Sequence, residues 1–151
     1  MDFEDTAEEA AFRKEARDWL AANVPTKEEK EGLDFLAAAK LWQKRKYDAG
    51  WAALRWPKEH GGRGATAIEA VIFGQEESKY QMVELGVFAI GHGMCAPTMM
   101  AWATEEQNKR FIPKLASGEE IWCQMFSEPA GGSDLAALRT RGEKDGDEWI
   151  I

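Results

Sequence analysis

Apolar residues recur at helical spacing through most of the chain, behind signals that begin helices. Three threonines are each followed three positions later by Glu or Gln, the pattern of a capping box: Thr6, Thr66 and Thr104. The spacing predicts helices over residues 7–22, 34–48, 66–80 and 85–102, and a short one from Thr104 to Pro113. Residues 55–64 are rich in turn formers and are expected to be irregular.

The most hydrophobic stretch, residues 82–103, is interrupted by glycines and by Pro97. Because proline lacks a backbone N–H and obstructs the preceding turn, residues 85–102 are expected to form one helix or two pieces. Glu84 and His92 also lie in the stretch. We therefore interpret it as a core helix and not as a membrane span.

Period-two alternation replaces the helical spacing near residue 120. Residues 122–127 alternate between two faces, which predicts a buried strand. Pro129 cannot donate to a ladder, so pairing is expected to stop there. The following Gly131 and Gly132 permit positive φ and a close approach of the backbone to a ligand.

A second β signal closes the chain. Residues 137–144 and 147–151 are predicted to be two strands joined by a two-residue turn, Asp145-Gly146. Because a lone hairpin is marginal in water, we expect the chain to be an N-terminal fragment of a longer protein or a truncated gene product.

Composition and charge narrow the class of protein. At 151 residues, with 44% apolar and 30% charged residues, the chain can bury a sizeable core. A net charge of −8 argues against nucleic acid or an anionic membrane surface as a partner, and the densest basic run, residues 44–46, is interpreted as a solvated helix face. Cys95 and Cys123 are interpreted as buried, reduced thiols. With no signal-peptide pattern at the N-terminus, a cytoplasmic location is expected.

Several kinds of site lack their motif. No Gly-x-Gly-x-x-Gly follows a strand, and the glycines around His92 lack the Lys and Ser/Thr of a phosphate loop. His60 and His92 have no partner at metal-ligand spacing, so no metal site is predicted, and His92 is interpreted as a satisfied core histidine. Ser133 has no nearby base that would make it a nucleophile. The glycine-rich residues 61–64 are interpreted as a structural loop.

The segment Phe126-Ser127-Glu128-Pro129, followed by Gly132-Ser133-Asp134, resembles the signature of the flavin-dependent acyl-CoA dehydrogenase family. Further blocks stand upstream in the family's order: Ala49-Gly50-Trp51, Trp56-Pro57, Gly61-Gly62-x-Gly64, Thr104-Glu105-Glu106-Gln107, Phe111-Ile112-Pro113, Leu115-Ala116-Ser117 and Gly118-Glu119. The resemblance covers essentially the whole chain, but only the first part of the family's architecture.

The fold that this resemblance implies is mainly α. A helical bundle domain over residues 1–118 is expected to precede the first strands of a β-barrel-like middle domain, of which residues 119–151 would be the incomplete beginning. Such a chain would have a truncated acyl-CoA dehydrogenase architecture.

The resemblance also implies residue roles. By position, Gln124, Met125, Phe126 and Ser127 would contact FAD, and Ser133 would touch both FAD and the acyl-CoA substrate. Glu128 is expected to organise the loop as a hydrogen-bond acceptor. The family removes the α-proton of an acyl-CoA thioester with a glutamate base while the β-hydride passes to the flavin, which yields a 2,3-enoyl-CoA. That glutamate lies in the family's C-terminal helical domain, so no catalytic residue is assigned in this chain.

Two functions stay open at this point. The first is the N-terminal part of an FAD-dependent acyl-CoA dehydrogenase of fatty acid or lipid metabolism, inactive as a fragment alone. The second is a non-catalytic helical interaction subunit or domain of a mixed acyl-CoA dehydrogenase-like oligomer. For the complete protein the resemblance implies a homo-oligomer, dimer or tetramer, with an electron-transfer flavoprotein as one candidate electron acceptor. Anionic CoA would require local cations, for which the candidates are Lys109, Arg110, Arg139, Arg141 and Lys144.

Overall fold

The computed structural model describes residues 4–80 and 85–151, and the part that it describes is mainly α, as predicted. The α-helices are α1 (Ala7–Asn23), α2 (Lys27–Lys30), α3 (Phe35–Asp48), α4 (Ala67–Glu77), α5 (Ala96–Trp102) and α6 (Glu105–Ser117). Shorter 3₁₀ turns are η1 (Lys58–His60), η2 (Leu85–Phe88) and η4 (Leu135–Ala137), and a π-helical turn, η3, spans Gly91–Cys95. The strands β1 (Glu143–Asp145) and β2 (Glu148–Ile150) form an antiparallel hairpin.

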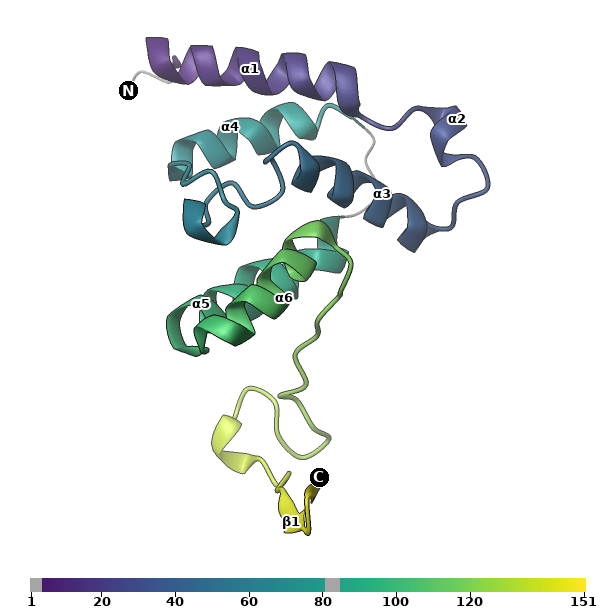
Figure 1. Cartoon of the computed structure of the whole chain (residues 1–151), viewed down its shortest axis with the longest axis vertical. Coiled ribbons are helices and arrows are strands. Elements are labelled where there is room, and N and C mark those ends of the chain that lie inside the picture. Colours follow the sequence, from purple (N-terminus) through teal and green to yellow (C-terminus); the bar gives the residue numbers. More distant parts are fainter. Residues whose placement is uncertain (1–3, 81–84) are drawn as a thin grey trace.

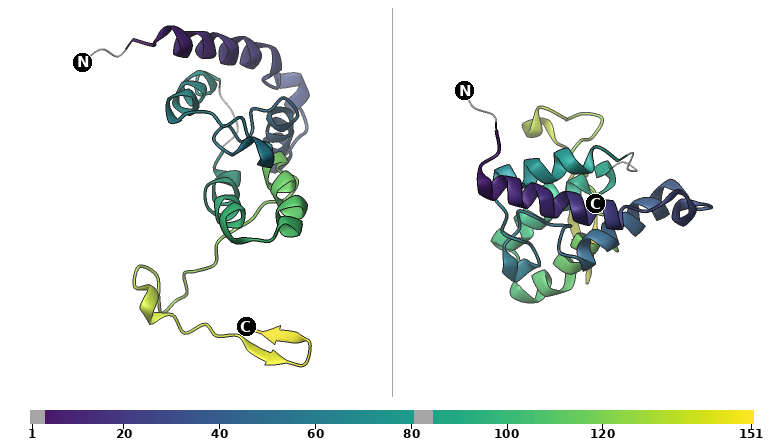
Figure 2. Two further views of the ribbon diagram at one scale, coloured as in Figure 1. Left: turned by 60° about the vertical axis from the view of Figure 1, so that its left-hand side comes forward. Right: turned by 90° about the horizontal axis from the view of Figure 1, so that it is seen from above.

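The helices lie in two layers, from which the C-terminal residues extend away (Figure 1, Figure 2). In the upper layer of Figure 1, α1 packs along α4. In the lower layer, α5 and α6 lie side by side, and α3 joins the layers because it also packs against α6.

Local sequence signals fix the helix starts. The predicted capping boxes at Thr6, Thr66 and Thr104 are all confirmed, each with reciprocal side-chain and backbone hydrogen bonds. A fourth box, formed by Thr26 and Glu29, begins the short helix α2, which the sequence analysis missed.

The upper layer is held together by stacked aromatic rings. The indoles of Trp19 and Trp42 have their centroids 5.4 Å apart, and Trp51 stacks on Phe73 at 5.0 Å. Leu20 of α1 is fully buried in the same cluster. Such offset aromatic pairs add to the free energy gained from burial, so these rings tie α1, α3 and α4 into one unit.

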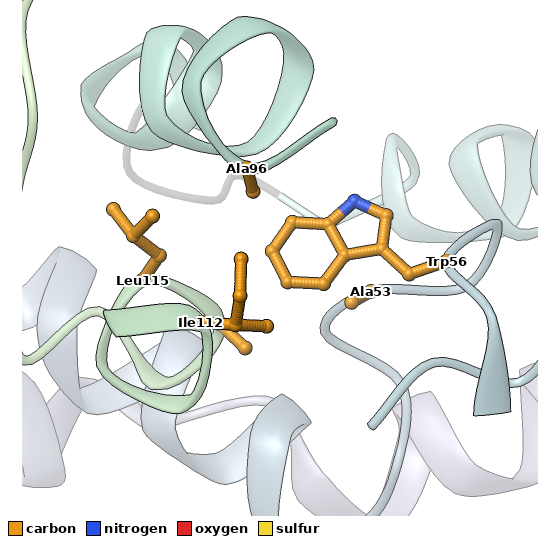
Figure 3. Close-up of a cluster of buried hydrophobic side chains, with 6 residues drawn as sticks. Ala53, Trp56, Ala96, Ile112 and Leu115 are labelled. Atoms are coloured by element: carbon orange, nitrogen blue, oxygen red, sulfur yellow. The ribbon is translucent and has the colours of Figure 1, made fainter. Parts of the chain in front are cut away.

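A second buried cluster joins the lower helices to the loop after α3. Ile112 and Leu115 of α6 meet Ala96 at the start of α5, and Ala53 and Trp56 of the loop close the cluster (Figure 3). The irregular segment around Trp56 is therefore a packed part of the core.

Pro113 lies inside α6, so the predicted end of this helix near Pro113 is wrong. The helix continues to Ser117 and ends at Gly118, which has a φ of 76°. Leu115 and its neighbour Ala116 are almost completely buried beyond the proline. Their burial outweighs the cost of an internal proline, about 3 kcal/mol.

Pro97 does not divide the helical segment that contains it. The π-turn η3 runs directly into α5, and the Ala96 N–H donates to the Gly91 carbonyl five residues earlier. Pro97 is the second residue of α5 but follows the π-turn without a break, so it lies inside one continuous helical segment. Of the predicted core stretch 82–103, residues 82–84 lie outside the described residues.

The predicted buried strand at residues 122–127 is wrong: this segment is not a strand and is mostly exposed. Met125 is 87% exposed and Phe126 63%. A strand requires a partner to accept its ladder hydrogen bonds, and no strand among residues 4–80 and 85–151 lies beside this segment.

The C-terminal hairpin exists but is shorter than predicted, because residues 137–142 are not part of a strand. Asp145 pairs with Glu148, so the two turn residues are Gly146 and Asp147 instead of the predicted Asp145-Gly146. Of the two turn residues, only Gly146 has a positive φ, 61°. This matches a type II′ turn, which has glycine at its first central position. Trp149 remains 65% exposed, so the hairpin buries little apolar surface.

Two further expectations concern thiols and membranes. Both cysteines are free, but the predicted burial is wrong, since Cys95 is half-buried and Cys123 is exposed. Within the described ranges, every helix is too short or too polar to cross a bilayer.

Candidate functional site

The glycine-rich loop after Pro129 is a tight, internally bonded structure. The Glu128 N–H donates to the Gly131 carbonyl at 2.9 Å, and the Gly131 N–H returns a bond to the Glu128 carbonyl at 3.1 Å. Gly131 is buried, and a Cβ there would come within 3.3 Å of the backbone at Ala137 and Leu138. This close approach favours glycine at residue 131, but it is to the loop's own backbone, whereas the sequence analysis expected an approach to a ligand, and neither Gly131 nor Gly132 has the positive φ that glycine permits.

The Glu128 carboxylate closes the loop from the inside. It accepts the backbone N–H of Arg139 at 2.5 Å and that of Thr140 at 3.0 Å, and the Thr140 hydroxyl donates to it as well. These bonds, led by the one from the Thr140 side chain, hold the pKa of Glu128 below its usual range. The predicted role of Glu128 as a loop-organising acceptor is confirmed. Its partner Thr140 was missed, because no local pattern links residues so far apart.

The two candidate serines lie on either side of this loop. The antiparallel bridge between Glu128 and Gly131 closes a tight turn, with Ser127 directly before it and Ser133 two residues after it. Both serines are exposed, and within the described part of the chain neither hydroxyl has a hydrogen-bond partner. The loop thus presents two free hydroxyl groups on a fixed framework.

Residues 121–127, which precede the loop, expose backbone hydrogen-bonding groups and apolar side chains. Gln124, Met125 and Phe126 are exposed beside Ser127, and the backbone N–H and C=O groups of residues 121–127 make no backbone hydrogen bonds within the described ranges. An extended edge of this kind can donate to heteroatoms of a ring, while the side chains of Met125 and Phe126 supply apolar contact.

The candidate cations differ in their freedom to bind an anion. Lys109 is paired with Glu105 at 2.6 Å, and Arg141 with Glu143 at 3.0 Å. Arg110, Arg139 and Lys144 have no ion pair among the residues that the structure describes, and of these three only Arg139 is held at the loop, by its backbone bond to Glu128. Arg139 is therefore the candidate best placed to meet a phosphate beside the loop.

His92 is a satisfied histidine, as predicted. Its Nε2 donates to the Leu115 carbonyl at 2.8 Å, because a carbonyl can only accept, and its ring lies 5.2 Å from that of Trp56. Burial, only partly offset by that hydrogen bond, lowers the pKa of His92. Among residues 4–80 and 85–151, no group of His, Cys, Asp and Glu side chains could hold a metal ion.

Comparison with known proteins identifies the family. Residues 6–119 match the model of the acyl-CoA dehydrogenase N-terminal domain. The chain belongs to the acyl-CoA dehydrogenase family. It is 36% identical over 148 residues to the acyl-CoA dehydrogenase IpdE1 of Mycobacterium tuberculosis, an alignment that covers 93% of this chain and 38% of that protein.

Two solved structures share the fold of this chain. The ChsE4-ChsE5 complex from Mycobacterium tuberculosis matches with a TM-score of 0.76 and 34% identity, over 99% of this chain and 38% of that one. The Tcur3481-Tcur3483 steroid ACAD matches with a TM-score of 0.74 and 29% identity, over 100% of this chain and 39% of that one. The chain thus spans less than two-fifths of the length of these acyl-CoA dehydrogenases.

Proposed function

We propose that this chain is the N-terminal part of an FAD-dependent acyl-CoA dehydrogenase that oxidises an acyl-CoA thioester to the 2,3-enoyl-CoA. The observation that carries the proposal is the Glu128 loop, a hydrogen-bonded turn that Ser127 precedes and Ser133 follows, with both hydroxyls free within the described residues. Family membership and the length of the relatives support it.

In this proposal, the residues ahead of the loop hold the cofactor. Gln124, Met125 and Phe126 lie against the flavin, and the Ser127 hydroxyl donates a hydrogen bond to it. Bound FAD would supply the two-electron oxidation of the acyl chain. Ser133 touches both the cofactor and the acyl-CoA, and Arg139 is the nearest cation for the phosphates of CoA.

The base that removes the α-proton is not assigned to this chain. The loop carboxylate, Glu128, already accepts three hydrogen bonds, so it is a poor proton acceptor. We propose that residues 1–118 act as the helical domain and residues 119–151 as the start of the middle β domain, and that the chain alone does not catalyse the reaction.

Flavin spectroscopy tests the proposal. A longer polypeptide that contains this chain, with the remaining domains of the family, should be purified with its natural cofactor. Absorbance of oxidised flavin that bleaches when acyl-CoA is added under anaerobic conditions would support the proposal. A folded, colourless protein that does not bind added FAD would overturn it.

A pair of substitutions at Ser127 tests the cofactor contact. Ser127→Ala removes one hydroxyl and should weaken FAD retention by about 0.5–1.5 kcal/mol, whereas Ser127→Thr keeps the hydroxyl and should retain FAD. Equilibrium dialysis of FAD measures both. If the two variants bound FAD with equal affinity, the assignment of Ser127 as a flavin contact would be wrong.

A second candidate is a subunit of a mixed oligomer. It is favoured by the two structural neighbours, because the ChsE4-ChsE5 complex and the Tcur3481-Tcur3483 steroid ACAD are each named for two proteins together. The steroid described for one neighbour also makes a bulky, polycyclic acyl group a candidate substrate. Co-expression with a second acyl-CoA dehydrogenase-like protein of the same genome should yield a stable mixed complex if this candidate is right, and failure to form one would count against it.

A further inference from the structure

The chain reverses its direction at the C-terminal end of α6, where the last carbonyls of a helix lack an intrahelical partner. The Gly118 N–H donates to the Leu115 carbonyl at 3.2 Å. The Glu120 N–H donates to the Lys114 carbonyl, also at 3.2 Å. In the described part of the chain, no backbone N–H reaches the Ala116 carbonyl, so this carbonyl needs a side-chain partner.

Side chains of α3 and η3 supply donors to this turn. Nε2 of Gln43 donates to the Ala116 carbonyl at 2.8 Å, and Nζ of Lys40 donates to the Glu119 carbonyl at 3.0 Å. Lys40 and Gln43 lie three residues apart on one face of α3, so together they bind the chain on both sides of Gly118. His92 of η3 binds the carbonyl before that of Ala116. We call Lys40, Gln43 and His92 the α6 cap.

The turn is packed closely against the α6 cap. Gln43 is 2% exposed, and Phe88 of η2 is buried beside the same turn. A Cβ at Gly118 would lie 2.9 Å from Cγ of Gln43 and 2.9 Å from the ring of Phe88. Glycine is therefore required here both by its φ of 76° and by the space available. The turn cannot move toward α3 unless buried side chains move with it.

Beyond the turn, the chain is attached to α6 as far as Trp122. The Trp122 indole N–H donates to Oε2 of Glu120 at 3.0 Å, and Lys114 of α6 pairs with the same carboxylate at 3.4 Å. The Trp122 ring meets that of Phe111 edge-on, with centroids 5.2 Å apart. The chain thus runs back beside α6 (Figure 1), and residues 124–127 begin two positions after the last attached side chain.

We propose that the α6 cap sets the direction in which residues 119–127 leave the helical layers, which makes Lys40 and Gln43 positioning residues for the segment that holds the flavin. Residues 121–127 make no backbone hydrogen bonds within the described ranges, so their placement relative to the helices is decided at the turn before them. The inference rests on the proposed function and adds to it two residues of α3 that do not contact FAD. They act on the cofactor site through the turn at Gly118.

Substitutions at Lys40 test the cap in this chain without any cofactor. Lys40→Met removes the donor to Glu119, so residual dipolar couplings of the amides of residues 119–122, measured against those of α6, should change. Lys40→Arg keeps a donor and should restore the couplings. Lys44→Met is the matched control, because Lys44 is exposed on the same helix and pairs with Asp48, and its couplings should equal those of the unaltered chain. Unchanged couplings in Lys40→Met would overturn the inference.

Gln43→Met tests the buried half of the cap. It keeps the length of the side chain but removes the donor, so the Ala116 carbonyl loses its partner. The couplings of residues 119–122 should shift further than in Lys40→Met, and a smaller shift would contradict the role given to Gln43. If this variant does not fold, the Lys40 series decides alone.

FAD affinity of the longer, flavin-binding polypeptide tests the positioning role. Lys40→Met should weaken FAD binding about tenfold, although it removes no group that contacts the cofactor, and Lys40→Arg should restore the affinity. The midpoint of thermal unfolding without FAD should stay the same in Lys40→Met, because its hydrogen bond lies at an exposed position. A loss of affinity with this unchanged midpoint separates positioning from a general loss of stability.

The same experiment separates the two proposals. If the unaltered polypeptide binds FAD and Lys40→Met binds it equally well, the positioning inference is wrong while the proposed function stands. If the unaltered polypeptide binds no FAD, the proposed function is wrong and the positioning inference falls with it.

Discussion

At the scale of single residues, Glu128 explains how a short loop is held without a surrounding sheet. Its carboxylate satisfies two backbone N–H groups and one hydroxyl, while Gly131 allows the two backbone segments to meet. Predicting Glu128 as an acceptor was possible because Pro129 and the glycines require a turn there. Thr140 was not predictable, because its pairing with Glu128 exists only once the loop has closed.

The loop predicts a clear difference between two substitutions. Glu128→Ala removes the acceptor, so the amides of Arg139 and Thr140 should lose their protection from hydrogen exchange. Glu128→Gln keeps one acceptor oxygen and should keep part of the protection. Site-resolved exchange by NMR measures both amides, and unchanged protection in the alanine variant would contradict the described loop.

At the scale of helices, α1 and α4 are joined by one buried carboxylate. Glu76 of α4 is 2% exposed and bonds to Arg13 at 3.2 Å and Arg17 at 3.1 Å, both on α1, and to Lys79 at 2.5 Å. The side-chain bonds, that from Arg17 first, lower the pKa of Glu76 to about 2. A residue without these partners would titrate near 4.5.

The sign of the pH effect follows from that lowered pKa. Because the folded state holds Glu76 deprotonated, its contribution to stability is complete above about pH 4.5 and is lost as the pH falls toward about 2. Glu76→Gln should lower the free energy of unfolding at pH 7 by about 2 kcal/mol and flatten this acid limb. Urea unfolding between pH 2 and pH 7 checks both, with Asp18→Asn as an exposed control that changes little.

The lower layer makes a separate prediction. Ile112 is 1% exposed in the cluster with Trp56 and Ala96 (Figure 3), so Ile112→Ala should destabilise the chain by about 2–5 kcal/mol. Ile68→Ala, at a position 54% exposed on α4, should cost much less. Thermal unfolding of the two variants compares them, and equal costs would contradict the described core.

Helices could be predicted from the sequence because their signals are local. A helix start is marked by each of Thr6, Thr66 and Thr104, because the capping box that each forms spans only four consecutive residues. Residues 122–127 could not be predicted in the same way, since alternation shows that a segment suits a strand and not that a partner strand is present. The end of α6 was predicted wrongly for a related reason. The free-energy cost of Pro113 in a helix can be predicted from the local sequence, but the burial of Leu115 that offsets it depends on tertiary packing.

At the scale of the whole molecule, two packed helical layers continue into an extended C-terminal part (Figure 2). That part exposes large apolar side chains, among them Met125, Phe126, Trp149 and Ile150. In the proposed function, this surface meets the cofactor and the remainder of the middle β domain.

The central claim is that residues 124–127 lie against the flavin. It is tested most directly by a crystal structure of the longer, flavin-loaded polypeptide. The account predicts that the Ser127 hydroxyl lies within hydrogen-bond distance of the flavin ring, below about 3.2 Å, with Ser133 beside it. A bound flavin remote from the Glu128 loop would contradict the account.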